Sequence, residues 1–153
     1  LAAWVIGYGI IQSGAPSVIR LKDAAGEIRA TTRLWSFILM TFTILLALLV
    51  AFDIAKSFTV IVGLLLFGVL FALNSSLHSY LILAFTEDDS DVAVNVGLYY
   101  SANAFGRLFG TLLSGLTYLW GGLAAALFAC CGFLAANWLI SFSFPKKIKS
   151  GLQ

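Results

Sequence analysis

The sequence predicts an all-α transmembrane helical bundle with about five membrane-spanning helices. Its 153 residues are 61% hydrophobic and only 10% charged, whereas a soluble domain averages about 25% charged residues. Five apolar stretches meet or approach the length of about 20 residues that a helix needs to cross the hydrocarbon layer. These stretches are too long for the strands of an outer-membrane barrel and lack their alternation, and helices satisfy the backbone groups that lipid cannot.

The first stretch, residues 1–18 (LAAWVIGYGIIQSGAPSV), carries polar groups on one helical face. Tyr8 and Gln12 are four residues apart, so they lie one above the other, and Pro16 bends or ends the helix. Tyr8 and Gln12 are therefore candidate substrate-binding groups in a cavity, with hydrogen bonding between helices as the alternative. The chain opens in an apolar run without a Met, and we expect it to be a piece of a longer protein.

The second and third stretches differ in polarity. Residues 34–52 contain no charge and are expected to serve as scaffold. Residues 58–85 are apolar at first and then carry a polar face that includes Asn74 and His78, one turn apart. Both are candidate substrate-binding residues.

His78 is the only histidine in the chain. Because imidazole exchanges protons near neutral pH, His78 is a candidate for proton coupling or for donating a hydrogen bond to a substrate. The alternative is a neutral histidine bonded to a neighbouring helix. One histidine without a nearby acid or cysteine makes no metal site, and nothing in the sequence indicates another cofactor.

The fourth stretch, residues 92–119, has one polar side. At 100° per residue, six polar-capable side chains fall within an arc of about 80°. These are Tyr100, Asn103, Arg107, Thr111, Ser114 and Tyr118. A ladder of small residues at four-residue spacing adjoins the arc and is expected to pack closely against another helix. The ladder consists of Ala102, Gly106, Gly110 and Ser114.

Arg107 lies near the middle of this fourth stretch, without an acid nearby in the sequence. An arginine at the bilayer centre costs roughly 2.5–3.5 kcal/mol on the translocon scale, and such a residue usually faces water or a partner. Its guanidinium matches carboxylate and phosphate oxygens two at a time. We therefore expect Arg107 to bind a small anionic substrate together with Asn103, Thr111 and Tyr100. The alternative is a structural ion pair with an acid elsewhere in a longer protein.

The fifth stretch, residues 123–144, is expected to be scaffold and ends before Pro145. Basic residues near span ends mark the cytoplasmic side. The linker 20–33 carries four of them and the tail 145–153 three, whereas only Lys56 lies on the other side. The linker and the C-terminus are therefore expected to be cytoplasmic. The acidic connection 86–91 counts little in this rule, and it suits the start of a helix; a gate or partner contact is the alternative.

These polar helices, short loops and basic linker resemble the C-terminal half of a major facilitator superfamily permease. Such permeases consist of two six-helix halves with the substrate site between them near the midplane. The resemblance implies that residues 1–153 supply helices 8 to 12, and that helix 7 and the N-terminal half are missing partners. Residues 74–85 (NSSLHSYLILAF) and 95–118 (NVGLYYSANAFGRLFGTLLSGLTY) resemble the ArsJ-type organoarsenical efflux permeases, and residues 7–16 (GYGIIQSGAP) are consistent with them.

The sequence departs from that group's pattern, in which Phe, Met and Gly are usual at the positions of Leu98, Ser101 and Phe105. The resemblance implies export of 1-arseno-3-phosphoglycerate across a bacterial inner membrane, coupled to the proton gradient. It also implies a functional link to a glyceraldehyde-3-phosphate dehydrogenase that makes this anion, and no nucleic-acid partner is expected.

Three alternatives remain at this point. The chain is a permease for another small anionic metabolite, a non-transporting or degenerate membrane fragment, or a membrane enzyme with His78 as general base. The enzyme would need a nucleophile, a metal or a second acid within its helices, and residues 58–85 and 92–119 contain no acid.

Overall fold

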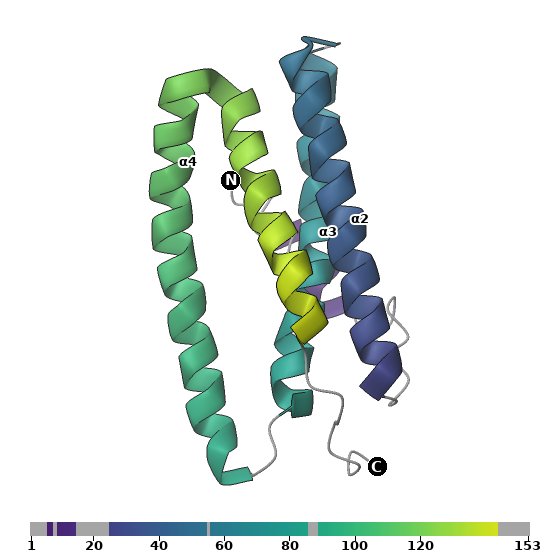
Figure 1. The fold of residues 1–153 in the computed structure, drawn as a ribbon, viewed down its shortest axis with the longest axis vertical. Coiled ribbons are helices and arrows are strands. Elements are labelled where there is room, and N and C mark those ends of the chain that lie inside the picture. Colours follow the sequence, from purple (N-terminus) through teal and green to yellow (C-terminus); the bar gives the residue numbers. More distant parts are fainter. Residues whose placement is uncertain (1–5, 8, 15–24, 55, 86–88, 144–153) are drawn as a thin grey trace.

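A computed structural model describes residues 6–7, 9–14, 25–54, 56–85 and 89–143, and almost all of these residues are helical. The labelled elements are α2 (Ala25–Ala51), α3 (Lys56–Phe85), α4 (Asp89–Ile140) and the short 3-10 helix η1 (Ser141–Ser143). Consecutive long helices run in opposite directions, as Figure 1 shows. The described part of the chain contains no strand, which confirms the predicted all-α class.

Helix α4 folds back on itself at a pair of glycines. Gly121 has φ −151° and ψ 22°, and Gly122 has φ 66° and ψ −159°, so neither is helical. The positive φ of Gly122 lies in a region that is essentially restricted to glycine. The chain reverses at this point (Figure 1), which is where the sequence predicts a turn between two spans. We call residues 89–120 the first arm of α4 and residues 123–140 its second arm.

Within the described residues, three helices are long and apolar enough to cross a membrane. Their apolar portions are Arg29–Ala51, Ser57–Leu81 and Ala93–Ser143, and the last one contains both arms of α4. The chain therefore has the character of an integral membrane protein. The first predicted span, 1–18, is described only at residues 6–7 and 9–14, so the total of five spans stays a prediction, as does the major facilitator fold.

Helix α2 begins at Ala25, nine residues before the predicted span 34–52. The segment AGEIRATTR contains no proline, and its Ala, Glu and Arg residues favour a helix. Arg33 lies in this extension and donates hydrogen bonds to the carbonyl oxygens of Ser141 (3.3 Å) and Phe142 (3.5 Å). These carbonyls follow the end of α4 and lack helical partners. An arginine of the linker therefore joins α2 to the end of α4.

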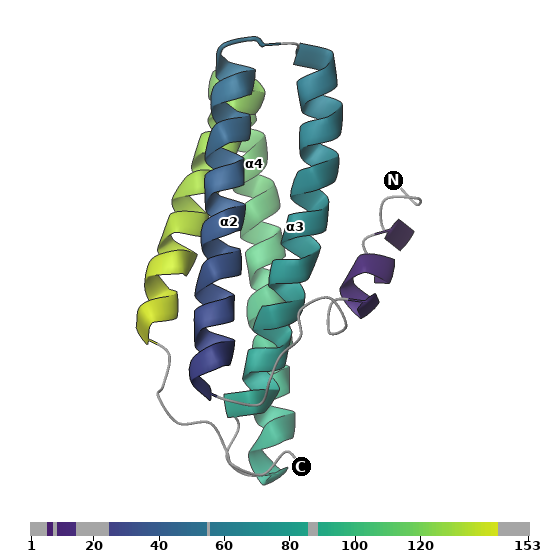
Figure 2. The same cartoon turned by 90° about the vertical axis from the view of Figure 1, so that its right-hand side faces the viewer.

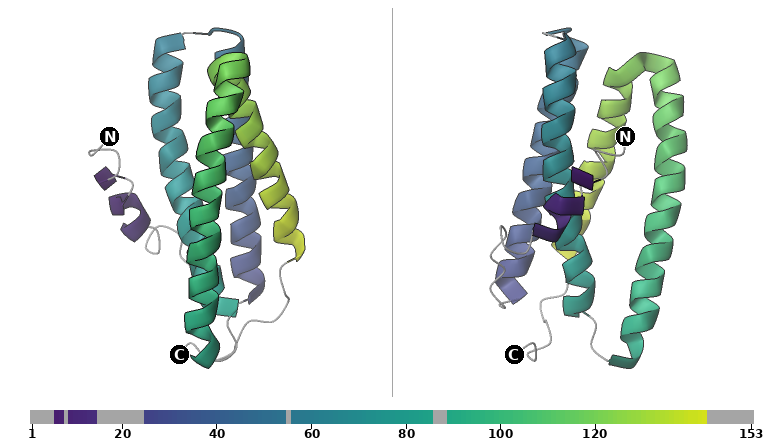
Figure 3. Two further views of the ribbon diagram at one scale, coloured as in Figure 1. Left: turned by 90° about the vertical axis from the view of Figure 1, so that its left-hand side faces the viewer. Right: turned by 180° about the vertical axis from the view of Figure 1, so that it is seen from behind.

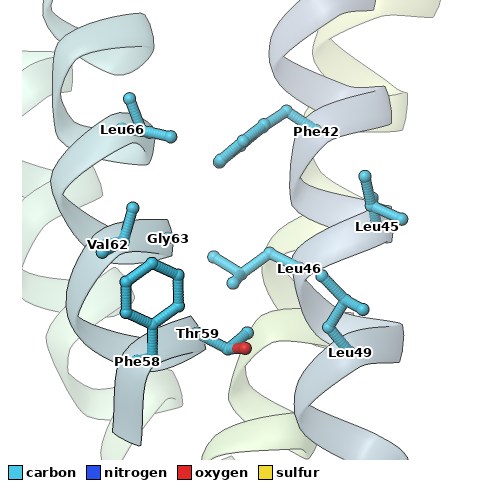
Figure 4. Close-up of a pocket in the computed structure, with 9 residues that line it drawn as sticks. All are labelled: Phe42, Leu45, Leu46, Leu49, Phe58, Thr59, Val62, Gly63 and Leu66. Atoms are coloured by element: carbon cyan, nitrogen blue, oxygen red, sulfur yellow. The ribbon is translucent and has the colours of Figure 1, made fainter. Parts of the chain in front are cut away.

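The apolar core lies where α2, α3 and the second arm of α4 meet. Its buried members are Leu46, Ala47, Val50, Leu127 and Cys131. Gly63 of α3 lets α2 approach closely, because a Cβ at this position would clash with Cδ1 of Leu46. Figure 4 shows Leu46 reaching from α2 toward Gly63, beside an apolar pocket of ≈ 180 Å³.

The first arm of α4 is packed least. Every residue from 100 to 116 is exposed, whereas the second arm contributes Leu127, Cys131 and Leu134 to the buried set. Figures 2 and 3 show the short N-terminal helical segment on the α3 side of the bundle, apart from α2 and the second arm. The polar side of the first arm is thus not enclosed by the described chain.

Candidate functional site

A polar cavity of ≈ 230 Å³ lies between α3, the first arm of α4 and the N-terminal helical residues. Three separate segments of the chain contribute to it, and all of its lining residues except Phe71 carry a polar side chain. The lining residues are Gln12, Phe71, Ser75, Ser79, Tyr99, Tyr100, Asn103 and Arg107. Four of the residues predicted to bind substrate are therefore brought together, namely Gln12, Tyr100, Asn103 and Arg107.

Arg107 sits near the middle of the first arm. It follows the start of α4 at Asp89 by 18 residues and precedes the turn at Gly121 by 14, which correspond to about 27 Å and about 21 Å of helix. The chain contains no Asp or Glu after Asp91, and no ion pair joins Arg107 to any described residue. Among the described residues, Arg107 is therefore the only charged one that lines this cavity.

The first arm presents opposite characters on opposite sides. Taking Asn103 as zero, Arg107 lies at about 40°, and the exposed apolar side chains Leu112 and Phe105 lie at about 180° and 200°. The apolar side suits contact with lipid, whereas the polar side borders the cavity. The division places Arg107 on the side of the arm that borders the cavity.

Tyr99 and Ser79 connect the first arm to α3 at one end of the cavity. Their hydroxyl oxygens are 2.8 Å apart, and the Ser79 hydroxyl also donates to the carbonyl oxygen of Ser75 at 3.1 Å. Tyr99 is not among the predicted site residues, because at about −40° it falls outside the polar arc. The adjacent tyrosines Tyr99 and Tyr100 could have indicated this contact. Adjacent helical residues point about 100° apart, so one of the two could face α3.

The N-terminal segment borders the cavity through Gln12. Ser76 of α3 donates a hydrogen bond of 3.5 Å to the carbonyl oxygen of Gln12, which ties residues 9–14 to α3. Tyr8, the other predicted residue of this segment, lies outside the described residues.

Asn74 is not among the residues that line the cavity. It is 5% exposed, and its Oδ1 accepts a hydrogen bond of 3.1 Å from the hydroxyl of Ser36 in α2. Asn137 of the second arm donates from Nδ2 to the same Ser36 oxygen at 3.4 Å. We call Ser36, Asn74 and Asn137 the polar triad. The triad joins three helices, so its arrangement corresponds to packing rather than to substrate contact.

His78 lies one turn beyond Asn74, and it also falls outside the cavity lining. Its Nδ1 is 2.8 Å from the backbone oxygen of Asn74, so Nδ1 carries the proton and donates it. The other ring nitrogen, Nε2, is buried and has no hydrogen-bond partner among the described residues. The described contact is with its own helix rather than with a neighbouring one, and the proposed role of His78 in proton coupling stays a prediction.

Thr111 and the small-residue ladder lie along the same arm, beyond the cavity. The Thr111 hydroxyl donates to the backbone oxygen of Arg107 at 2.7 Å, which occupies its proton. Gly106, Gly110 and Ser114 border an open groove of ≈ 430 Å³ between the two arms, and a Cβ at Gly106 or Gly110 would meet nothing within 4 Å. Ala102 is exposed. The ladder therefore makes no close helix contact within the described chain, and its packing role stays a prediction.

The side chains that line this cavity offer hydrogen-bond donors and acceptors and one positive charge. Arginine offers five N–H donors and no acceptor, while the hydroxyl and amide groups can donate and accept. Among the described residues, no group of three or more His, Cys, Asp or Glu side chains is placed to hold a metal ion.

Comparisons of the chain with protein-family models, with curated proteins and with solved structures find no match.

Proposed function

We propose that this chain forms part of a secondary transporter that moves a small organic anion across a membrane, with Arg107 as the anion-binding residue. The observation that carries the proposal is the polar cavity around Arg107, which lies beside a helix long and apolar enough to span the membrane. A polar cavity inside a membrane-spanning protein offers a polar solute a passage across the hydrocarbon layer.

The free energy of placing Arg107 there supports an aqueous cavity. An arginine in hydrocarbon is unfavourable by at least about 2.5 kcal/mol, and a tyrosine hydroxyl and an amide beside it add to that cost. Water or a bound anion beside Arg107 removes most of this penalty. No Asp or Glu occurs in residues 92–153, so a structural ion pair of Arg107 would have to use an acid earlier in the chain or elsewhere in a longer protein.

The exposed polar side of the first arm supports the view that further protein covers it. Tyr100, Asn103 and Arg107 are all exposed in the described chain, and polar groups within a bilayer face a bundle interior or a water-filled cavity. In a permease of the major facilitator type, the opposing helices of the other half would supply the missing wall. On this proposal the C-terminus lies in the cytoplasm of a bacterial cell.

The resemblance to organoarsenical efflux permeases narrows the proposed substrate to an arsenylated phosphoglycerate. Its phosphate oxygens would accept paired hydrogen bonds from the Arg107 guanidinium. Asn103 and Gln12 would bond its remaining oxygens. A companion glyceraldehyde-3-phosphate dehydrogenase would provide the substrate.

The test is export of small organic anions from cells that express the complete gene, with Arg107→Gln as the variant. Loss of a charged hydrogen bond is worth about 1.5–3 kcal/mol, so substrate affinity should fall by roughly 10- to 150-fold. Arg33→Gln is the matched control, because Arg33 contacts Ser141 and Phe142 away from the cavity. Membrane abundance should be equal for all three proteins.

Unchanged export by Arg107→Gln would remove Arg107 from the transport path. Arsenic export, measured with and without the companion dehydrogenase, tests the narrower proposal. If other organic anions leave the cell and arsenic does not, a permease for another anionic metabolite replaces the organoarsenical assignment. A complete gene that exports none of these anions would favour the non-transporting membrane protein.

A further inference from the structure

Both hydrogen bonds of Ser79, at one end of the cavity, can form together in one direction only. A serine hydroxyl has a single proton, and Ser79 donates that proton to the backbone oxygen of Ser75. The contact of 2.8 Å between the Ser79 and Tyr99 hydroxyls allows either atom to donate, and both contacts are hydrogen bonds only when Tyr99 is the donor of this second one. The bonds run from Tyr99 to Ser79 and from Ser79 to the Ser75 carbonyl.

This direction leaves the Tyr99 oxygen as an acceptor only. Its one proton is held by Ser79, so its remaining lone pairs can receive a hydrogen bond but the group cannot donate another. Tyr99 also lines the cavity, and its ring packs against that of Tyr100 with centroids 5.6 Å apart. The ring contact and the bond to Ser79 together hold the oxygen in place.

Arg107 has the opposite character. Its guanidinium can only donate, and it lies eight residues beyond Tyr99, or about 12 Å along the same helix. The cavity thus has a donor-only cation toward one end and an acceptor-only oxygen toward the other. Gln12 and Asn103 have amides that can serve in either sense, so they do not alter this polarity.

We propose that the cavity selects anions that carry a hydroxyl group, with Tyr99 as the residue that determines this specificity. Arg107 binds the anionic group, and the Tyr99 oxygen accepts a hydrogen bond from the ligand hydroxyl. This inference rests on the proposed function, since it concerns the same cavity. The cavity has a volume of ≈ 230 Å³ within the described chain.

The experiment compares three organic phosphates with the same three-carbon skeleton. Glycerol 3-phosphate carries hydroxyls, acetol phosphate carries only a carbonyl acceptor, and propyl phosphate carries neither. Binding to the full chain in lipid nanodiscs is measured by calorimetry. One neutral hydrogen bond changes affinity about three- to tenfold, so glycerol 3-phosphate should bind more tightly than the other two phosphates by that factor.

Tyr99→Phe should abolish the preference while the ring contact with Tyr100 is kept. Tyr118→Phe is the matched control, because Tyr118 is an exposed tyrosine of the same arm outside the cavity lining. Ser79→Ala provides an independent test that leaves Tyr99 intact. It frees the Tyr99 proton, so acetol phosphate should then bind about three- to tenfold more tightly than propyl phosphate.

The outcomes separate this inference from the proposed function. If Arg107→Gln leaves the affinity for all three phosphates unchanged, the anion site itself is wrong. If Arg107→Gln weakens all three but Tyr99→Phe keeps the wild-type preference, only the role of Tyr99 is wrong. Wild-type protein that binds the three phosphates equally, or binds none of them, overturns the inference.

Discussion

The polar triad yields the sharpest test of the fold, because the bond between Ser36 and Asn74 joins two buried side chains of different helices. Ser36 is 0% exposed and Asn74 is 5% exposed, and their side chains are 3.1 Å apart. Replacing either residue by alanine leaves the other without its partner in the interior. We therefore expect Ser36→Ala and Asn74→Ala each to lower the free energy of unfolding by about 1–3 kcal/mol.

The double variant isolates the bond itself. Hydrogen bonds between helices in membranes average about 0.6 kcal/mol and reach about 1.7 kcal/mol. The Ser36–Asn74 distance of 3.1 Å is slightly longer than is usual for an O–H···O bond, so its coupling energy should lie near that average. The 3.4 Å contact between Ser36 and Asn137 is long, so its coupling should fall below the average.

The assay is reversible unfolding of the chain in mixed micelles by titration with a denaturing detergent. Tryptophan fluorescence reports on the region directly, because Trp35 precedes Ser36 and Trp138 follows Asn137. Thr43 supplies the control, since it is also 0% exposed but donates to Leu39 of its own helix. A cycle of Thr43→Ala with Asn74→Ala should be additive within about 0.5 kcal/mol. If the Ser36–Asn74 cycle is equally additive, the triad does not join α2 to α3.

Two further predictions concern glycines. Gly63→Leu should destabilise the chain by about 1–3 kcal/mol, because the new side chain would displace Leu46 between α2 and α3. The control is Gly115→Leu, whose side chain enters open space and should leave the unfolding midpoint unchanged within error. Equal midpoints for both variants would contradict the close approach of α2 to α3 at Gly63. Gly122→Ala should lower the free energy of unfolding by about 1–3 kcal/mol through the positive φ of this position alone. The control Gly115→Ala should not lower it. An unfolding midpoint that Gly122→Ala leaves unchanged would place the chain reversal elsewhere.

Much of the fold could be predicted because lipid-crossing helices need length and apolarity, both of which are visible in sequence. The predicted span 58–85 corresponds closely to Lys56–Phe85, and the expected turn falls at Gly121–Gly122. The start of α2 at Ala25 was not predictable from hydropathy, because this end is stabilised by contacts with residues more than a hundred positions away. Arg33 provides those contacts by bonding Ser141 and Phe142.

The site residues could be predicted only where the spacing within a single helix groups them on one side. The 100° period alone grouped Tyr100, Asn103 and Arg107, and all three line the cavity. The period cannot state which neighbouring helix a polar side faces. Asn74 and Ser75 are adjacent in sequence, yet Asn74 turns toward Ser36 of α2 while Ser75 borders the cavity.

Polar side chains in these helices therefore fall into two physical groups, and hydrogen bonding separates them. In the polar triad Ser36 and Asn74 are buried and Asn137 is partly buried. The three side chains bond to one another across helices, so their polarity is satisfied within the bundle and stabilises it. Arg107 and Asn103 are exposed to a cavity and have no ion pair or side-chain bond to one another, so their hydrogen-bonding capacity is left for something outside the chain. A buried polar group of the first kind contributes to stability, whereas a group of the second kind costs stability unless water or a ligand meets it. The concentration of the second kind on the least packed arm, beside a single uncompensated cation, favours a path for anions over a structural role.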